Sequence, residues 1–126
     1  MGLPHQARAV GFVLTADRET ARRFYSDVLG LTVLSEDPFA VAYDSFGMVL
    51  RLTDVAGFVA GPHPVLGWEV PDIRALSRDL RATGVQFEIY DGFGQDDLGI
   101  WTAPDRGVMV NWFKDPDGNV LSLTQR

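Results

Sequence analysis

Short apolar runs and one helical pattern recur in each half of the chain. In the first half, Val10–Thr15 is an apolar run of strand length, and Asp17 follows where a helix N-cap belongs. The helix that follows carries one apolar face, and Gly30 ends it. The apolar face comprises Ala21, Phe24, Tyr25, Val28 and Leu29. Three further strands are expected at Leu31–Ser35, Phe39–Asp44 and Met48–Thr53.

The second half repeats the order of the first. After a segment rich in Gly, Pro and Ala at 54–64, the run Val65–Val70 predicts a strand, and Asp72 predicts a second helix cap. That helix turns Ile73, Leu76 and Leu80 inward, Gly84 ends it, and Val85–Tyr90 is expected as the next strand. The pattern therefore predicts an α+β fold of two βαβββ units, about 8–54 and 65–125, joined by the linker 54–64 in a single domain 1–126.

The chain closes on a predicted antiparallel hairpin. Val108–Phe113 and Val120–Leu123 are apolar runs, and the turn residues Asp115–Gly118 lie between them. The long connection Asp91–Gly107 is expected to contain one short extra strand, Gly99–Ala103. Turn formation is the ordinary role of Asp115 and Asp117, and metal ligation or catalysis is the alternative.

Composition narrows the function classes. The formal charge of −6 and the lack of a Lys/Arg cluster argue against nucleic acid and anionic membranes as partners. Cysteine is absent, which excludes disulfides, thiolate nucleophiles and sulfur metal sites. No apolar run reaches the length of a membrane span, and Met1–Gln6 lacks a signal-peptide core. A soluble cytoplasmic protein is therefore expected.

Several motifs of the chain resemble the vicinal oxygen chelate superfamily. They are Phe113–Leu123 with its Asp-Pro-Asp-Gly-Asn turn, Arg23–Leu31, Val70–Asp72 and Leu80–Val85. That superfamily contains glyoxalase I, extradiol dioxygenases, and the fosfomycin and bleomycin resistance proteins. The resemblance implies two βαβββ units that form a curved mixed sheet around a ligand cavity, and a homodimer. Because these residues cap, pack and turn, they indicate the fold strongly and the function weakly.

The metal positions implied by the resemblance do not hold metal ligands. Counted from the nearest motif, they are Val10, Arg51, Val65 and Ser122. A divalent cation needs converging anionic or imidazole ligands, and Arg51 is a permanent cation. The two histidines lie in the N-terminal tail and in the linker. The sequence therefore predicts no metal and no cofactor.

Strand alternation then predicts which side chains face the cavity. The inward set is Val10, Phe12, Leu14, Val49, Arg51, Thr53, Val65, Gly67, Glu69, Ser122 and Thr124. A four-residue turn would pair Asn111 with Ser122 and add Asn111 and Phe113 to this face. A bulge in the hairpin would place Trp112 there instead. The predicted ligand-binding residues are Phe12, Arg51, Glu69, Trp101, Asn111, Phe113 and Ser122.

Each of these residues has a structural alternative. Arg51 and Glu69 are either recognition groups or an ion pair across the sheet. Asn111 and Ser122 are either ligand contacts or a cross-strand hydrogen bond. Trp68 is expected beneath a helix. Trp101 lies in a Gly-rich loop and has no periodic reason to belong to the core, so beside Tyr90 and Phe93 it is a candidate lid or stacking surface.

Three functions follow in order of preference. The first is a metal-free protein that binds a small aromatic or charged molecule, similar to the bleomycin-type resistance proteins. The second is a metal-independent lyase or isomerase in which Glu69 is the base and Arg51 stabilises an anion. A metal-dependent lyase or dioxygenase ranks last.

Overall fold

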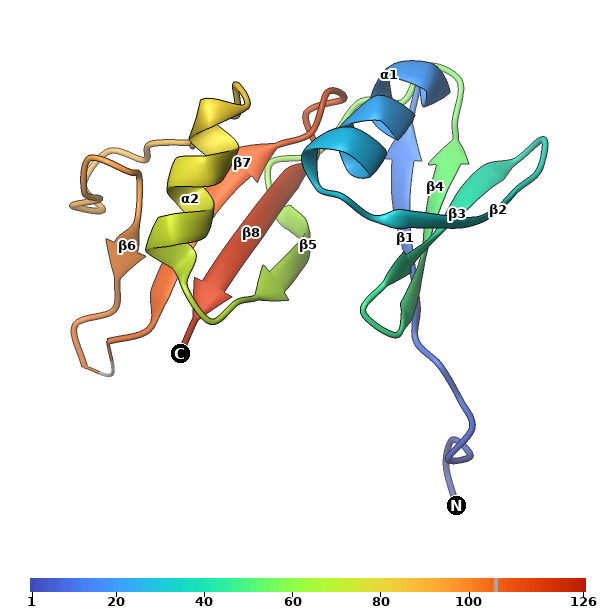
Figure 1. The fold of residues 1–126 in the computed structure, drawn as a ribbon, viewed down its shortest axis with the longest axis horizontal. Coiled ribbons are helices and arrows are strands. Elements are labelled where there is room, and N and C mark those ends of the chain that lie inside the picture. Colours follow the sequence, from blue (N-terminus) through green and yellow to red (C-terminus); the bar gives the residue numbers. More distant parts are fainter. Residues whose placement is uncertain (106) are drawn as a thin grey trace. The chain divides into compact units, whose positions relative to one another are not determined.

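The computed structural model describes residues 1–105 and 107–126, and these form two compact units, Met1–Val59 and Ala60–Arg126 (Figure 1). Each unit contains a four-stranded mixed sheet and one helical segment or helix, which confirms the α+β class. The boundary between the units falls inside the expected linker. That both units form one domain stays a prediction. No helix of the described residues is long and apolar enough to cross a membrane.

The N-terminal unit has the predicted order of elements. They are β1 (Val10–Thr15), α1 (Arg18–Arg23), η1 (Phe24–Val28), β2 (Thr32–Glu36), β3 (Ala40–Ser45) and β4 (Met48–Asp54). The strand order in the sheet is β1-β4-β3-β2. Strand β1 runs parallel to β4, and the other neighbours are antiparallel.

The helical segment of this unit begins as predicted and then widens. Asp17 is the N-cap, since its side chain accepts hydrogen bonds from Thr20 N at 3.3 Å and Thr20 Oγ1 at 2.7 Å. From Phe24 the helix is a π-helix, in which Leu29 N donates to Phe24 O at 3.0 Å. Gly30 ends it at φ 72°, a conformation that glycine adopts without strain.

One face of the first sheet is buried beneath this helical segment. Val13, Leu50 and Leu52 are almost fully buried there. Tyr43 joins them, and its hydroxyl donates to Arg22 O at 3.2 Å and lies 2.9 Å from Ser26 Oγ. The side chains of Phe12 and Arg51 alternate to the opposite face, because each lies one residue away from a buried neighbour.

Asp37, in the turn between β2 and β3, predicts acid sensitivity of this unit. Its Oδ1 accepts hydrogen bonds from Phe39 N at 2.7 Å and Ala40 N at 2.9 Å. These two bonds, helped by the charges of Arg51 and Arg18, lower the pKa of Asp37 below its ordinary value. A lowered folded-state pKa contributes stability above the unfolded-state pKa of about 3.9, and the contribution is lost as the pH falls through the folded-state pKa.

We therefore expect NMR titration of the Asp37 carboxyl carbon to give a pKa below that of an unfolded peptide. In Asp37→Asn the amide oxygen still accepts both hydrogen bonds, but the group no longer titrates. Urea unfolding of this variant should lose part of the acid sensitivity of the native protein. An Asp37 pKa at or above the peptide value would contradict this account.

The C-terminal unit contains β5 (Pro64–Glu69), α2 (Ile73–Ala82), β6 (Trp101–Thr102), β7 (Met109–Lys114) and β8 (Val120–Gln125). The strand order is β5-β8-β7-β6, with β5 parallel to β8. Helix α2 packs against β7 and β8, as Figure 1 shows. Asp72 caps it by accepting from Ala75 N at 3.0 Å, which confirms the prediction, and Ile73 and Leu80 are buried.

The predicted strand Val85–Tyr90 is wrong except for one bridge, between Phe87 and Phe113. The segment does not form a longer strand because the side chain of Gln95 binds backbone groups that would otherwise pair with a neighbouring strand. Its Nε2 donates to Glu88 O at 2.8 Å and its Oε1 accepts from Tyr90 N at 2.7 Å. The expected short strand within Gly99–Ala103 is confirmed as β6, and it occupies the sheet edge beside β7. Residue 106 of the expected connection Asp91–Gly107 lies outside the described residues.

The closing hairpin is confirmed, but its predicted register is wrong. Trp112 pairs with Ser122, and Asn111 pairs with Leu123. The turn has five residues because the Asp115 backbone N donates to Asn119 O at 3.0 Å, which draws Asn119 into it. The strands pair without a bulge, but the longer turn shifts the register as a bulge would and exchanges the faces of Asn111 and Trp112.

Candidate functional site: an aromatic cluster on the second sheet

Four aromatic rings gather on the face of the second sheet opposite α2. Tyr90 and Phe93 each lie within 6.0 Å of Trp112, measured between ring centroids. Trp101 lies 6.4 Å from both Phe93 and Trp112, and Tyr90 lies 5.5 Å from Phe93. We call Tyr90, Phe93, Trp101 and Trp112 the aromatic cluster. At these separations the rings pack on one another, so a ligand would lie against their outer faces.

Strand register fixes the face on which the cluster lies. Asn111 points to α2, since its Nδ2 donates to Ser77 Oγ at 3.0 Å in a buried bond. Trp112 is the next residue along β7 and therefore points to the opposite face. Trp101 of β6 is in register with Val110, which shares the face of Trp112.

A hydrogen-bonded loop positions the other two rings. Gln95 Nε2 also donates to Gly99 O at 2.7 Å, so one side chain ties together the segments on either side of Phe93. The backbone N of Glu88 donates to Trp112 O at 2.8 Å, and this bond anchors the start of the loop on β7. The loop therefore holds Tyr90 and Phe93 against Trp112.

Polar groups share this face with the cluster. Ser122 of β8 is paired with Trp112 of β7 on one side and with Gly67 of β5 on the other. A Cβ at Gly67 would fall 2.3 Å from Ser122 Oγ, so the serine side chain fills the space that glycine leaves. Glu69 lies two residues beyond Gly67 on the same face, is largely exposed and forms an ion pair with Arg126 at 3.3 Å. Lys114 and Glu88 form another at 3.3 Å.

The predicted residues of the first sheet, Phe12 and Arg51, lie on the sheet face that the sequence analysis assigned to the cavity, opposite the helical segment. Phe12 is 60% exposed, and Arg51 is its partner in the register of β1 and β4. Arg51 Nη2 lies 3.7 Å from Asp37 Oδ2. Arg51 and Glu69 thus each have a counter-charge within their own unit, Asp37 and Arg126, which the sequence analysis missed.

We predict that Arg51→Met changes the free energy of unfolding by about 1 kcal/mol or less, because a partly exposed ion pair contributes little. Glu69→Gln should behave in the same way, and urea unfolding of both single variants and the double variant measures the three values. Strong destabilisation in the single variants that the double variant relieves would show a structural Arg51–Glu69 pair instead.

The structure separates Asn111 and Phe113 from the other predicted ligand contacts. Both are fully buried, and Asn111 Nδ2 also donates to Leu98 O at 3.2 Å. The expected hydrogen bond from Asn111 to Ser122 is wrong, because Asn111 lies opposite Leu123 and points to α2. Trp112, which is half-buried, lies on the sheet face that was assigned to them. The sequence feature that could have placed Trp112 on this face is the Asp-Pro-Asp-Gly-Asn turn, which has five residues rather than four.

The side chains at the four positions that the resemblance assigns to metal ligands do not fit a divalent cation. Val10 and Val65 offer only hydrocarbon, Arg51 is a cation, and Ser122 offers one neutral hydroxyl. Within residues 1–105 and 107–126, no group of three or more His, Cys, Asp or Glu side chains is placed to hold a metal. That the protein works without metal stays a prediction.

Comparison with known proteins identifies the family. The model of the Glyoxalase/Bleomycin resistance protein/Dioxygenase superfamily matches residues 3–123. The chain therefore belongs to this superfamily. A search of the curated proteins finds no match.

Solved structures show the same fold at low identity. A glyoxalase family protein from Bacillus anthracis is 16% identical, with TM-score 0.75 and coverage of 100% of this chain and 99% of that one. One from Enterococcus faecalis is 20% identical, with TM-score 0.74 and coverage of 95% and 97%. Lactoylglutathione lyase from Agrobacterium tumefaciens is 18% identical, with TM-score 0.73 and coverage of 97% and 95%.

Proposed function

We propose that this chain is a metal-independent small-molecule binding protein whose ligand lays a flat ring against the aromatic cluster. The observation that carries the proposal is the gathering of four rings on a sheet face that is not covered by a helix among the described residues of its unit. Phe93 is 48% exposed, and both Trp101 and Trp112 keep part of their surface exposed. Exposed aromatic surface of this kind is typical of ligand recognition. Binding of this kind would resemble that of the bleomycin-type resistance proteins.

The charges favour a cationic ligand over an anionic one. The chain carries a net charge of −6, and the carboxylates on the face of the cluster, Glu69 and Glu88, are balanced by Arg126 and Lys114, so the net charge of the chain and the rings supply the attraction. Tryptophan rings attract cations through their negative faces. A planar cation therefore gains both stacking and electrostatic attraction.

Isothermal titration with a matched pair of probes tests the proposal. The planar cation 9-aminoacridine and its neutral relative acridine would be titrated into protein dialysed against EDTA. We expect saturable binding of both, with 9-aminoacridine about tenfold tighter because of cation–π attraction. A requirement for added divalent metal, or no binding of either probe, would overturn the proposal.

The geometry gives the enzymatic alternative less support. A general base that works near neutral pH usually gains its basicity from burial, whereas Glu69 is 61% exposed and paired with Arg126. Turnover that is lost in Glu69→Gln while binding is retained would favour the enzyme.

We also propose that the protein is a cytoplasmic homodimer. Val10, Phe12 and Val65 expose apolar surface on the two sheet faces, and a second copy would cover such surface. Light scattering at micromolar concentration should give twice the chain mass, and a monomer would count against the dimer. Cell fractionation tests the location.

A further inference from the structure

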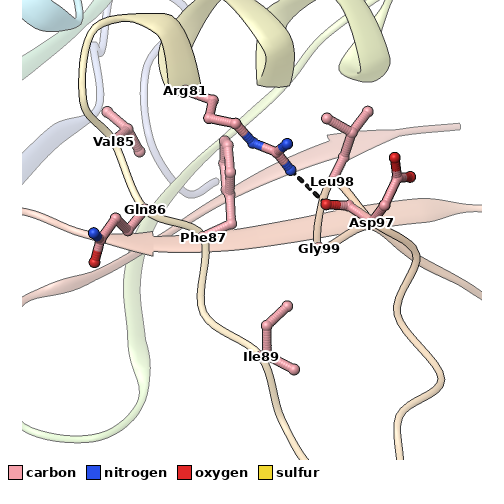
Figure 2. A pocket seen from close by; sticks show the side chains of 8 residues that line it. All are labelled: Arg81, Val85, Gln86, Phe87, Ile89, Asp97, Leu98 and Gly99. Carbon is pink, nitrogen blue, oxygen red and sulfur yellow. Dashed lines mark hydrogen bonds between the residues drawn. The ribbon is translucent and has the colours of Figure 1, made fainter.

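A pocket of about 290 Å³ lies in the C-terminal unit, between the end of α2 and the loop that follows it (Figure 2). Its apolar lining comes from Val85, Phe87, Ile89 and Leu98, and Gly99 forms part of the wall. Arg81, from the last turn of α2, stands over Phe87 at its rim. The pocket thus combines an apolar interior with one cationic side chain.

The pocket lies on the opposite face of the sheet from the aromatic cluster. The ring of Phe87 packs edge-on against Phe113 at 5.8 Å, and Phe113 is buried on the side of α2. Tyr90 and Glu88 alternate to the other side, where Tyr90 contacts Trp112. The segment 85–90 therefore separates the two places, and a ligand in the pocket would not touch the cluster.

Gly99 keeps this pocket open. Its φ of 88° is one that glycine adopts without strain, and an added Cβ would lie 2.9 Å from Asn111 Oδ1, 3.0 Å from Phe87 Cβ and 3.5 Å from Ile89 Cδ1. A side chain here would thus press on two of the residues that line the pocket. Ile89 is 64% exposed, so an apolar side chain of the lining remains available to a ligand.

Arg81 is the only charged group of the lining whose charged atoms turn toward the pocket in Figure 2. Its Nη2 donates to the backbone O of Asp97, while the Asp97 carboxylate points away from the guanidinium. Among the described residues, no carboxylate forms an ion pair with Arg81, whereas Arg74 of the same helix pairs with Asp96 at 3.0 Å. A guanidinium has five N–H donors, so Arg81 retains donors for an anion.

We propose that this pocket is a second binding site, independent of the function proposed above, for a small monocarboxylate with an apolar body. The carboxylate would accept hydrogen bonds from Arg81, and the body would lie against Phe87, Ile89 and Leu98. At roughly 30 Å³ per non-hydrogen atom the pocket holds about ten such atoms. Octanoate has this size and chemistry, and octanamide is its neutral counterpart.

A ¹H–¹⁵N NMR titration with these two probes tests the site. We expect octanoate to shift the amide signals of Phe87 and Gly99 in a saturable way, and to leave the indole signals of Trp101 and Trp112 unchanged. Octanamide should bind about tenfold more weakly, since it lacks the charge that Arg81 recognises.

Variants separate the roles of charge and apolar contact. Arg81→Met should weaken octanoate binding about tenfold, and Arg78→Met, on an exposed turn of the same helix, should leave it unchanged. Ile89→Asp changes an exposed side chain, so it should fold and still weaken binding. Unchanged affinity in both Arg81→Met and Ile89→Asp, equal binding of the two probes, or no saturable shift at millimolar octanoate would each overturn the proposal.

Discussion

Replacing Asp115 with alanine is expected to destabilise the C-terminal unit by about 3 kcal/mol. Its carboxylate is buried and accepts hydrogen bonds from Asp117 N at 2.9 Å, Asn119 N at 2.9 Å and Asn119 Nδ2 at 2.8 Å. A hydrogen bond to a charged group contributes about 1.5–3 kcal/mol, and each of these donors would lose its carboxylate acceptor in the alanine variant. Because such contributions are not additive, the estimate stays below the roughly 4.5 kcal/mol to which three bonds at the lower value would sum.

Urea unfolding of Asp115→Ala measures this loss, with Asp91→Ala as the matched control. Asp91 is an exposed aspartate of the same unit, so its replacement should change the free energy of unfolding by about 0.5 kcal/mol or less. Equal stability of the two variants would show that the turn does not depend on Asp115. Because the five-residue turn sets the register of Trp112, Asp115→Ala should also weaken ligand binding at the aromatic cluster.

Trp112→Ala is expected to weaken binding of 9-aminoacridine by roughly thirtyfold, or about 2 kcal/mol. Trp112 is the centre of the aromatic cluster, since its ring contacts those of Tyr90, Phe93 and Trp101. Its removal takes away one stacking surface and the support of the other three rings. Isothermal titration with the variant gives the change in the dissociation constant.

Trp68→Ala is the control for this variant. Trp68 lies on β5 in register with Leu123, which is buried on the face that α2 covers. Its replacement therefore removes the same type of side chain from the opposite face of the same sheet. We expect lower stability with unchanged affinity for 9-aminoacridine. Equal weakening in both variants would show that the cluster is not the binding surface.

Local signals were enough to predict most of the fold. Asp17 and Asp72 cap their helices with their own side chains, and Gly30 and Gly84 follow the helices at positive φ. Each of these features depends on a few neighbouring residues, so it can be predicted from a short stretch of the sequence. The prediction of a strand at Val85–Tyr90 was wrong because it depends on a more distant residue. Its apolar pattern fits a strand, but a side chain five residues beyond it, Gln95, binds its backbone.

For the candidate site, the sequence predicted the sheet face of a side chain only where strand alternation alone determines that face. Phe12, Arg51, Glu69 and Ser122 point as expected, because each strand keeps its alternation. The ion partners Asp37 and Arg126 lie in a turn and at the chain end, where no periodic pattern reveals a contact.

The hairpin shows how one residue changes the site. Counting a four-residue turn placed Asn111 and Phe113 on the open face, and one more residue in the turn exchanges every side chain of β7 between the two faces. The contact of Trp101 with Phe93 was anticipated from their shared loop. The position of Trp112 at the centre of the cluster could be predicted only with the correct register of the hairpin.

The most direct test of the proposed function uses the three indole N–H signals of the protein. Trp101 and Trp112 belong to the aromatic cluster, and Trp68 lies on the opposite face of the same sheet, so each signal reports on a known position. The protein, dialysed against EDTA, would be titrated with 9-aminoacridine and followed by ¹H–¹⁵N NMR. Our account predicts that the Trp101 and Trp112 signals shift together to saturation while that of Trp68 stays in place. A shift of Trp68 alone, or no shift of any indole signal, would contradict it.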